Sequence, residues 1–279
     1  METYLIPALI LGGCGILAGV LLTIASKVFY VKVDERIEKI SEALPQANCG
    51  ACGFAGCADY ADAIVTKGAP TNLCRPGGAD AAGKIAGILG TAAAEVIPMT
   101  AVVHCSGDCE ATKPQFDFDG VQSCKAVKRF YGGNGSCKFG CIGLGDCAAV
   151  CEHDAIKIIN GVAKVEPALC GACGQCAAAC PNSLISIKPK SKHIDVLCSS
   201  GDNGKATKLA CKNGCIGCKM CEKKCPTGAI KVENFHAVID YDKCENCGEC
   251  MAACPVKVIH SCKSKKQRCL PIISASSVV

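Results

Sequence analysis

The sequence contains no tryptophan, and aromatic residues make up only 4% of its 279 positions. Aromatic side chains supply much of the buried apolar area of large domains. Their scarcity argues against one large core and favours several small modules that bound metal stabilises. Cysteine is the opposite case, because the chain carries 28 of them.

This density of cysteine is usual only in short secreted disulfide scaffolds, and the chain is too long for that class. A disulfide framework would also require export to an oxidising compartment. Many of the cysteines stand instead in tight runs, such as CIGCKMCEKKCP at residues 215–226. Thiols so closely spaced are poor partners for one another and good ligands for one inorganic centre. The sequence therefore favours metal-bound thiolates in a reducing compartment.

A strong excess of one charge is also lacking, since the net charge is +5 with every thiol counted as neutral. A thiolate-bound [4Fe-4S] cluster carries about two negative charges, so five clusters would bring the chain to about −5. The basic balance therefore gives no reason to expect a nucleic-acid partner. A short basic run at residues 263–268 is interpreted as a solvated tail.

No charged residue occurs in the 23 positions of residues 4–26, YLIPALILGGCGILAGVLLTIAS, and about 20 suffice for a helix to cross a bilayer. A cleavable signal peptide is the alternative, but only Glu2 and no basic residue precedes the run. We therefore expect a retained transmembrane helix. Lys27, Lys32 and Arg36 follow it directly. The positive-inside rule then predicts a single-pass protein of the cell membrane, with its N-terminus outside and the remaining chain in the cytoplasm.

The run at residues 215–226 recurs 29 residues later as CENCGECMAACP, at residues 244–255. In bacterial two-cluster ferredoxins, such a run gives three ligands to one [4Fe-4S] cluster and its fourth cysteine to the other. Zinc ribbons are the alternative, but they need only four cysteines, in two separated pairs. Two short strands that turn at Glu233 and Asn234 are expected between the runs. The predicted ligand sets are Cys215, Cys218, Cys221 and Cys254 for one cluster, and Cys244, Cys247, Cys250 and Cys225 for the other.

A shift of 74 residues upstream finds the same pattern again, with Leu144 in the place of Cys218. One site of this upstream module is complete, although Glu152 replaces the usual proline; its ligands are Cys170, Cys173, Cys176 and Cys151. The other site lacks one ligand and keeps Cys141, Cys147 and Cys180. Two outcomes are open there. Either Cys137 serves as the fourth ligand, which the flexible glycines nearby permit, or the site holds a [3Fe-4S] centre. We expect the four-iron cluster with Cys137.

A different motif, C-x2-C-x4-C-x16-C, lies nearer the N-terminus and consists of Cys49, Cys52, Cys57 and Cys74. Glycines between these cysteines allow backbone amides to approach cluster sulfurs. Residues 58–67 have helical spacing, so a cluster here would lie against a helix N-terminus. The spacing alone also suits zinc, but the neighbouring ferredoxin-type runs favour iron and sulfur. Residues 75–98 are rich in glycine and alanine and are interpreted as a hinged helical connector.

With an apolar N-terminal run, the C-x2-C-x4-C-x16-C motif and two ferredoxin-type modules in this order, the chain resembles the B subunits of the Rnf complex. That complex is the ion-translocating ferredoxin:NAD oxidoreductase of bacterial and archaeal membranes. The likeness covers nearly the whole chain, with Leu144 and Glu152 as departures. It implies one component of a Na⁺ or H⁺ translocase that takes electrons from soluble ferredoxin. It also implies membrane and peripheral partner subunits, among them membrane subunits with flavins and an iron-sulfur centre.

Signs of bond-making chemistry are absent from the sequence. No G-x-G-x-x-G motif stands between a strand and a helix, no pairing of nucleophile and base stands out, and the five histidines are scattered. No catalytic site is therefore expected in the isolated chain. The alternatives to the Rnf-type protein are a polyferredoxin that serves a hydrogenase or another membrane oxidoreductase and, in another class, a zinc-binding scaffold.

The expected fold class is α+β. It combines a transmembrane anchor at residues 1–30, a small helical [4Fe-4S] domain with its connector at 31–98, and two tandem dicluster ferredoxin-like modules at 99–190 and 191–279. Five [4Fe-4S] clusters are expected. A sixth, on Cys105, Cys109 and Cys124, stays open but is not expected. The similar stretches HCSGD and LCSSGD, which contain Cys105 and Cys198, are interpreted as a vestige of duplication. Cys211, Cys262 and Cys269 receive no role.

Overall fold

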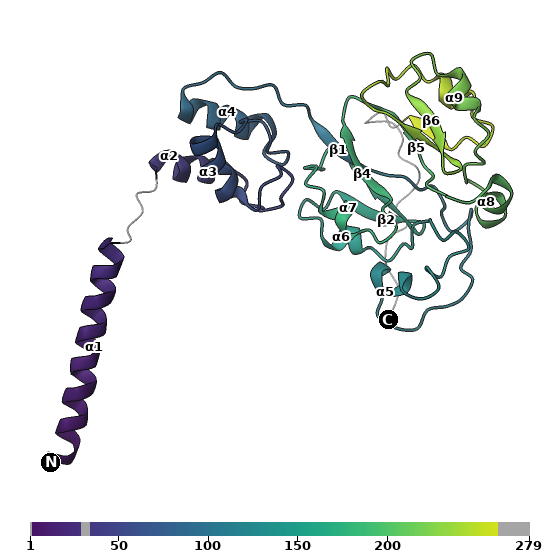
Figure 1. The fold of residues 1–279 in the computed structure, drawn as a ribbon. Coiled ribbons are helices and arrows are strands. Elements are labelled where there is room, and N and C mark those ends of the chain that lie inside the picture. Colours follow the sequence, from purple (N-terminus) through teal and green to yellow (C-terminus); the bar gives the residue numbers. More distant parts are fainter. Residues whose placement is uncertain (1, 29–33, 262–279) are drawn as a thin grey trace, which may run out of the picture.

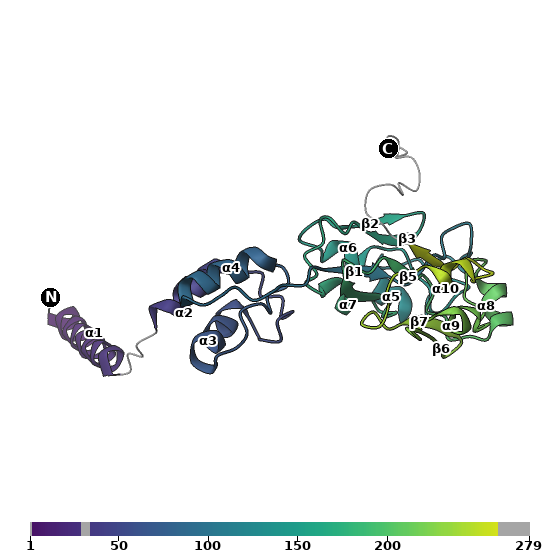
Figure 2. The same cartoon turned by 90° about the horizontal axis from the view of Figure 1, so that it is seen from above.

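The computed structural model describes residues 2–28 and 34–261, with side chains from residue 12 onward except at 26 and 28. Three parts follow one another, and their order is the same from both directions of view (Figures 1 and 2). They are the helix α1 (Glu2–Val28), a small helical domain, and two modules built from short strands and short helices. The basic tail and Lys32 lie outside the described residues.

The structure contradicts the prediction of a transmembrane helix. Among the described residues, no helix has both the length and the apolar character that crossing a membrane requires.

The helical domain consists of α2 (Glu35–Ala43), α3 (Cys57–Lys67) and α4 (Gly78–Leu89). One fully buried side chain from each helix meets in its core, namely Ile40, Tyr60 and Ile85. The Tyr60 hydroxyl donates to the carbonyl oxygen of Pro70 at 2.6 Å and accepts from the amide of Leu73 at 3.1 Å. The helix predicted from residue 58 is confirmed.

The predicted helical connector takes a different form. Its helical part, α4, buries Ala81, Ala82, Ile85 and Ala86 in the core of the helical domain. An apolar face of this kind is stabilised by burial and does not separate from its domain at small cost. Only residues 90–98, between α4 and the first strand of the next module, remain as a link.

The first module contains two antiparallel strand pairs. β1 (Met99–Val103) pairs with β4 (Ile185–Pro189), and β2 (Ile156–Ile159) pairs with β3 (Val162–Val165). Three short helices complete it: α5 (Cys124–Lys128), α6 (Asp146–Ala149) and α7 (Gln175–Ala179). Its core combines branched aliphatic side chains, such as Val162 and Leu184, with cysteines. An interior so rich in cysteine leaves the sulfur atoms facing inward.

The second module repeats this order. β5 (Ile194–Val196) pairs with β8 (Ile259–Ser261), and β6 (Ile230–Glu233) pairs with β7 (His236–Ile239). The helices are α8 (Gly204–Ala210), α9 (Met220–Lys224) and α10 (Glu249–Ala252). The β6–β7 hairpin confirms the predicted strand pair, but its turn lies one residue later than expected, because Glu233 pairs with His236 and the turn consists of Asn234 and Phe235, with φ of 46° and 65°. Positive φ at both turn residues is the conformation that two-residue hairpins prefer.

Candidate iron-sulfur sites

The first module holds a hollow lined by four cysteines, Cys124, Cys141, Cys147 and Cys180. Its other walls include the apolar side chains of Val103, Ile158 and Leu184. Burial and three neighbouring thiols raise the pKa of Cys147 to about 12; those thiols belong to Cys141, Cys124 and Cys180.

The structure places Cys124 in this quartet and Cys137 elsewhere. Cys137 does not line the hollow, and its thiol instead raises the pKa of the buried Cys105 and of the half-buried Cys198. The choice of Cys137 as the fourth ligand is therefore not supported by the geometry. Cys105 does not line this hollow either. The structure therefore does not support the sixth site considered from the sequence, which would have joined Cys105, Cys109 and Cys124.

An insertion in the first module explains how Cys124 reaches the position. Cys105 and Cys198 are 93 residues apart, whereas Cys137 and Cys211 are 74 apart, so the first module has 19 additional residues between its two cysteines. α5 and Cys124 lie in this longer segment. The insertion thus supplies a thiol to the site where Leu144 took one away.

Asp146 fixes α5 against this quartet. Its carboxylate accepts hydrogen bonds from the amides of Cys124 and Lys125, at 2.9 and 3.0 Å, and from the Ser123 hydroxyl at 2.9 Å. Burial by itself raises the pKa of Asp146, but these donors outweigh it and hold the pKa below its usual value. A helix start that is tied to a carboxylate in this way holds the neighbouring Cys124 in place.

The second quartet of the first module also lines a hollow; its members are Cys151, Cys170, Cys173 and Cys176. Burial and the other thiols of the quartet raise the pKa of Cys176 to about 11. The amides of Ala101 and Ala172 each donate to the sulfur of Cys170 at 3.4 Å. Amide donors to sulfur stabilise negative charge on a ligated cluster.

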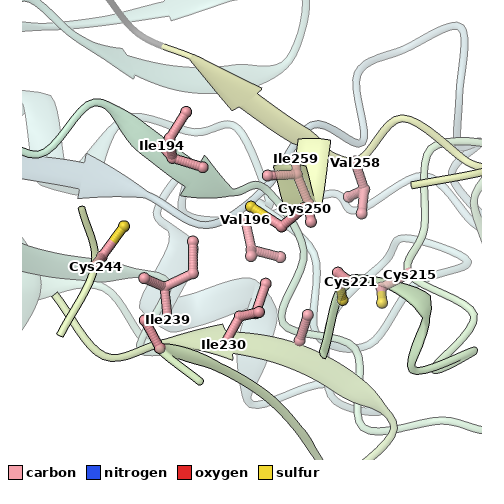
Figure 3. Close-up of a cluster of buried hydrophobic side chains, with 12 residues drawn as sticks. Ile194, Val196, Cys215, Cys221, Ile230, Ile239, Cys244, Cys250, Val258 and Ile259 are labelled. Atoms are coloured by element: carbon pink, nitrogen blue, oxygen red, sulfur yellow. The ribbon is translucent and has the colours of Figure 1, made fainter. Parts of the chain in front are cut away.

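In the second module, each run of cysteines meets the last cysteine of the other run. Burial and three thiols raise the pKa of Cys221 to about 11; the thiols are those of Cys215, Cys218 and Cys254. The pKa of Cys250 is raised to about 11 by burial and by the thiols of Cys225, Cys244 and Cys247. Figure 3 shows Cys215 and Cys221 together on one side of Val196 and Ile230, and Cys244 on the other side.

The helical domain gathers its own quartet beside the start of α3. Burial raises the pKa of Cys74, and the thiols of Cys57, Cys49 and Cys52 act in the same direction. Asn48 caps α3, because its side-chain oxygen accepts from the amide of Cys57 at 2.8 Å. A Cβ at Gly56 would lie 2.9 Å from that oxygen. A larger residue at position 56 would displace the Asn48 side chain, so glycine there leaves room for the hydrogen bond to Cys57.

Thiolate donors in these groups suit an iron-sulfur cluster. Among the described residues, no three His, Cys, Asp or Glu side chains lie close enough to hold a single metal ion. A zinc ion draws its four sulfurs to about 2.3 Å from one point, whereas a [4Fe-4S] cluster binds them at four separate iron corners. Four inward-facing thiols around a hollow fit the larger group.

The quartets of the helical domain and of the first module are neighbours. Besides burial, the thiol of Cys49 acts on Cys173 and raises its pKa, ahead of the smaller effects of Cys151 and Cys170. Cys49 belongs to the helical domain, and Cys173 belongs to the first module. One cysteine of each quartet therefore lies within electrostatic reach of the other across the boundary between these parts.

Comparisons with known proteins agree with this arrangement. Residues 44–76 match a family described as a putative Fe-S cluster domain, and residues 214–258 match the 4Fe-4S dicluster domain. Over 93% of its length, the chain is 44% identical to the B subunit of the ion-translocating oxidoreductase complex of Methanosarcina acetivorans, and the match covers 99% of that protein. The chain belongs to the family of Rnf complex B subunits.

Two further relatives carry more specific names. The B subunit of the sodium-translocating ferredoxin:NAD oxidoreductase complex of Acetobacterium woodii is 41% identical over 93% of the chain, which corresponds to 78% of that protein. The proton-translocating counterpart of Clostridium ljungdahlii is 37% identical, and the match covers 93% of each chain. The chain is thus an electron-transfer iron-sulfur subunit of an ion-translocating ferredoxin:NAD oxidoreductase complex. The resemblance inferred from the motifs is confirmed.

The role of Cys124 could not be deduced from the repeat. The 74-residue shift aligns Cys124 with Cys198 and Cys137 with Cys211, and Cys137 is the nearer of the two to the defective run. The signal that could have indicated the change is the unequal spacing, because HCSGD and LCSSGD stand 93 residues apart. That inequality reveals the insertion that contains Cys124.

Proposed function

We propose that this protein takes electrons from reduced soluble ferredoxin and delivers them to membrane subunits of its complex that carry flavins and an iron-sulfur centre. Each of five cysteine quartets would hold one [4Fe-4S] cluster, which when bound gains and loses one electron. The proposed ligand sets are Cys49, Cys52, Cys57 and Cys74; Cys124, Cys141, Cys147 and Cys180; Cys151, Cys170, Cys173 and Cys176; Cys215, Cys218, Cys221 and Cys254; and Cys225, Cys244, Cys247 and Cys250.

The observation that carries the proposal is the approach of Cys49 to Cys173. It brings the quartet of the helical domain against the first ferredoxin-like module. Transfer of electrons between two centres becomes steeply slower as their separation grows, so sites that face each other suit a relay. The same reasoning favours residues 34–98, 99–190 and 191–261 as three cofactor-binding units in series.

Surface charge suggests where the donor approaches. Exposed lysines follow the exposed Cys218, at the start of α9 and in its last turn; they are Lys219, Lys223 and Lys224. Exposed acidic residues flank Cys247 instead, namely Glu245 and Glu249. A ferredoxin gains negative charge from its clusters, and complementary charge accelerates encounter and fixes orientation. We place the docking site for ferredoxin on the Cys218 side of the second module.

The complex acts at a membrane, because the relatives are named as subunits of ion-translocating complexes. We propose that this chain is held there through its partner subunits. We propose that the quartets lie on the cytoplasmic side, where a reducing compartment keeps thiolates available as cluster ligands.

Anaerobic purification of the full chain tests the cofactor assignment. We expect about 20 iron atoms or more per chain, with equal acid-labile sulfide, because five cubanes contain that many. Rapid mixing with reduced ferredoxin should bleach the visible absorption of the chain while ferredoxin becomes oxidised. Chain stripped of iron by a chelator is the control. Zinc in place of iron, or iron-loaded chain that leaves ferredoxin reduced, would contradict the proposal.

Charge reversal tests the docking side. The variant Lys219→Glu/Lys223→Glu/Lys224→Glu should slow reduction by ferredoxin and weaken the dependence of the rate on salt concentration, since steering by charge is screened by salt. The matched control is Glu245→Lys/Glu249→Lys, which alters the surface around Cys247. A larger loss of rate in the control than in the lysine variant would place the donor at the other side.

A further inference from the structure

Four cysteines outside the five quartets stand at equivalent positions in the two modules. Cys105 and Cys198 each lie two residues beyond a strand, β1 and β5 respectively. Cys137 and Cys211 each lie four residues before the first cysteine of a ferredoxin-type run. Each module therefore contributes one cysteine of each kind. None of the four is used by the proposed relay.

The sulfurs of Cys105 and Cys211 approach the same glycine from different modules. A Cβ placed on Gly107 would lie 3.7 Å from the sulfur of Cys105 and 3.2 Å from the sulfur of Cys211. Both side chains are only 7% exposed. Their sulfurs are thus directed into one buried space where the modules meet.

Cys137 and Cys198 share this space. Burial raises the pKa of Cys105, and the thiols of Cys137 and Cys198 add to the rise. Burial likewise raises the pKa of Cys211, with further effects from the thiols of Cys105 and Cys137. Cys137 acts on Cys198 as well. All four thiols are therefore neighbours, as in each quartet described above.

Backbone amides from equivalent positions in the two modules donate hydrogen bonds to sulfurs of this group. The amide of Cys141 donates to the sulfur of Cys105 at 3.4 Å, and the amide of Cys215 donates to the sulfur of Cys198 at 3.2 Å. Cys141 and Cys215 correspond to each other in the 74-residue repeat. Gly107 adds a second amide to Cys105, at 3.4 Å. Amides aimed at sulfur are the outer contacts that tune ligated clusters.

Direct hydrogen bonds between the modules hold the surrounding loops. The side-chain amide of Asn213 donates to the carbonyl oxygen of Ser106 at 2.8 Å. The Thr112 hydroxyl donates to the carbonyl oxygen of Ala210 at 2.9 Å, directly before Cys211. The Ser106 hydroxyl donates to the carbonyl oxygen of Leu197 at 3.1 Å, directly before Cys198. The ligand loops are thus fixed relative to one another before any cofactor binds.

We propose that Cys105, Cys137, Cys198 and Cys211 bind a sixth [4Fe-4S] cluster, shared equally between the two modules. The inference rests on the proposed binding of clusters by the other quartets. Cys109, which the sequence places near Cys105, is exposed, and its sulfur lies instead against Gly161 in the β2–β3 turn. The shared site therefore contains neither Cys109 nor Cys124.

Its position gives the shared quartet a role in the relay. Cys141 belongs to a quartet of the first module and Cys215 to a quartet of the second, and both donate their amides to the shared group. The shared site therefore lies between the nearest sites of the two modules. With it, an uninterrupted series of sites runs from the helical domain to the second module.

Iron analysis of anaerobically purified full-length variants tests this site. Wild-type chain should contain about 24 iron atoms, and Cys105→Ser/Cys211→Ser should contain about four fewer. Electron paramagnetic resonance of the reduced proteins should show the loss of one centre while five remain. Cys109→Ser is the matched control, since it removes an exposed cysteine of the same segment, and it should keep all of its iron.

The outcomes separate the two proposals. Almost no iron in the wild-type chain would refute cluster binding as a whole. About 20 iron atoms in both wild-type chain and Cys105→Ser/Cys211→Ser would refute the sixth site alone. If the double variant does not fold, the half-buried Cys198→Ser substitution replaces it, with the same expected loss of one resonance. A wild-type spectrum that fits five centres would overturn the inference without any variant.

Discussion

The Nζ atom of Lys188 lies 2.5 Å from each carboxylate oxygen of Asp195, and both side chains are buried. Lys188 belongs to β4 of the first module, and Asp195 belongs to β5 of the second. The Tyr241 hydroxyl donates to Asp195 at 2.8 Å, and Lys188 also donates to the carbonyl oxygen of Lys192 at 2.8 Å. The ion pair thus ties together the strands on either side of the link between modules.

We expect Asp195→Asn to lower the free energy of unfolding by about 3–5 kcal/mol, because it leaves the buried ammonium of Lys188 without its counter-charge. Anaerobic denaturant titration of the loaded protein measures this. Asp240→Asn is the matched control, since it breaks an exposed pair with Lys243 and should cause no measurable change. Equal changes in the free energy of unfolding for the two substitutions would show that the buried pair contributes no more to stability than the exposed one.

Cys124→Ser should convert one centre of the first module into a three-iron form, detected by electron paramagnetic resonance of the oxidised protein. Leu144→Cys in the same chain should restore the four-iron centre. The backbone supports this rescue, because Gly143 and Gly145 have φ of 84° and 85°, and their counterparts Gly217 and Lys219 have 65° and 59°. The loop at residue 144 therefore has the conformation of the loop that carries Cys218.

The combination Cys137→Ser/Leu144→Cys provides the contrast for this rescue. Cys137 is proposed as a ligand of the shared site. A thiol at position 144 should therefore not restore the cluster that is lost from the shared site in Cys137→Ser. If Leu144→Cys restored the cluster lost in Cys137→Ser, and Cys124→Ser had no effect, then Cys137 and not Cys124 would be the fourth ligand of the first-module site.

Asp146→Asn should loosen α5 and weaken the hold on Cys124. Hydrogen bonds to a charged acceptor contribute about 1.5–3 kcal/mol, so faster amide exchange is expected in the segment around Cys124, together with faster loss of iron to a chelator. Hydrogen-exchange mass spectrometry follows the first effect. Asp119→Asn, at an exposed position of the same insertion, should leave exchange unchanged.

The pH dependence of Asp146 follows from its lowered pKa. The carboxylate is ionised at neutral pH, so its stabilising effect is fully present above the ordinary pKa of an aspartate. The effect disappears in acid, as the pH falls through the lowered pKa of the folded state. Wild-type chain and Asp146→Asn should therefore converge in stability only at low pH.

Cluster loading should release protons and become weaker as the pH falls. Burial and neighbouring thiols raise the pKa of Cys221 and Cys250 to about 11 each, so these thiols are protonated in the unloaded protein at neutral pH. Ligation requires thiolates, and each proton released changes the affinity about tenfold per pH unit. Anaerobic reconstitution with iron and sulfide at several pH values measures the effect. Cys221→Ser should release fewer protons, and loading that is independent of pH would contradict the prediction.

The repeated cysteine spacing determined much of this protein without any structure. Local patterns in the sequence predicted the hairpin of the second module, β6–β7, and the helix that starts beside Cys57, because both depend mainly on neighbouring residues. Family membership followed for the same reason, because the motifs and their order are a property of the linear sequence.

Tertiary structure decided which distant residues meet. Spacing favoured Cys137 for the defective site, but the 19 additional residues of the first module bring Cys124 there instead. The same structure packs α4 into the helical domain. It also gathers the thiols of two modules at their junction. Spacing describes only local chain geometry, whereas these contacts close loops whose path depends on the packing of whole modules.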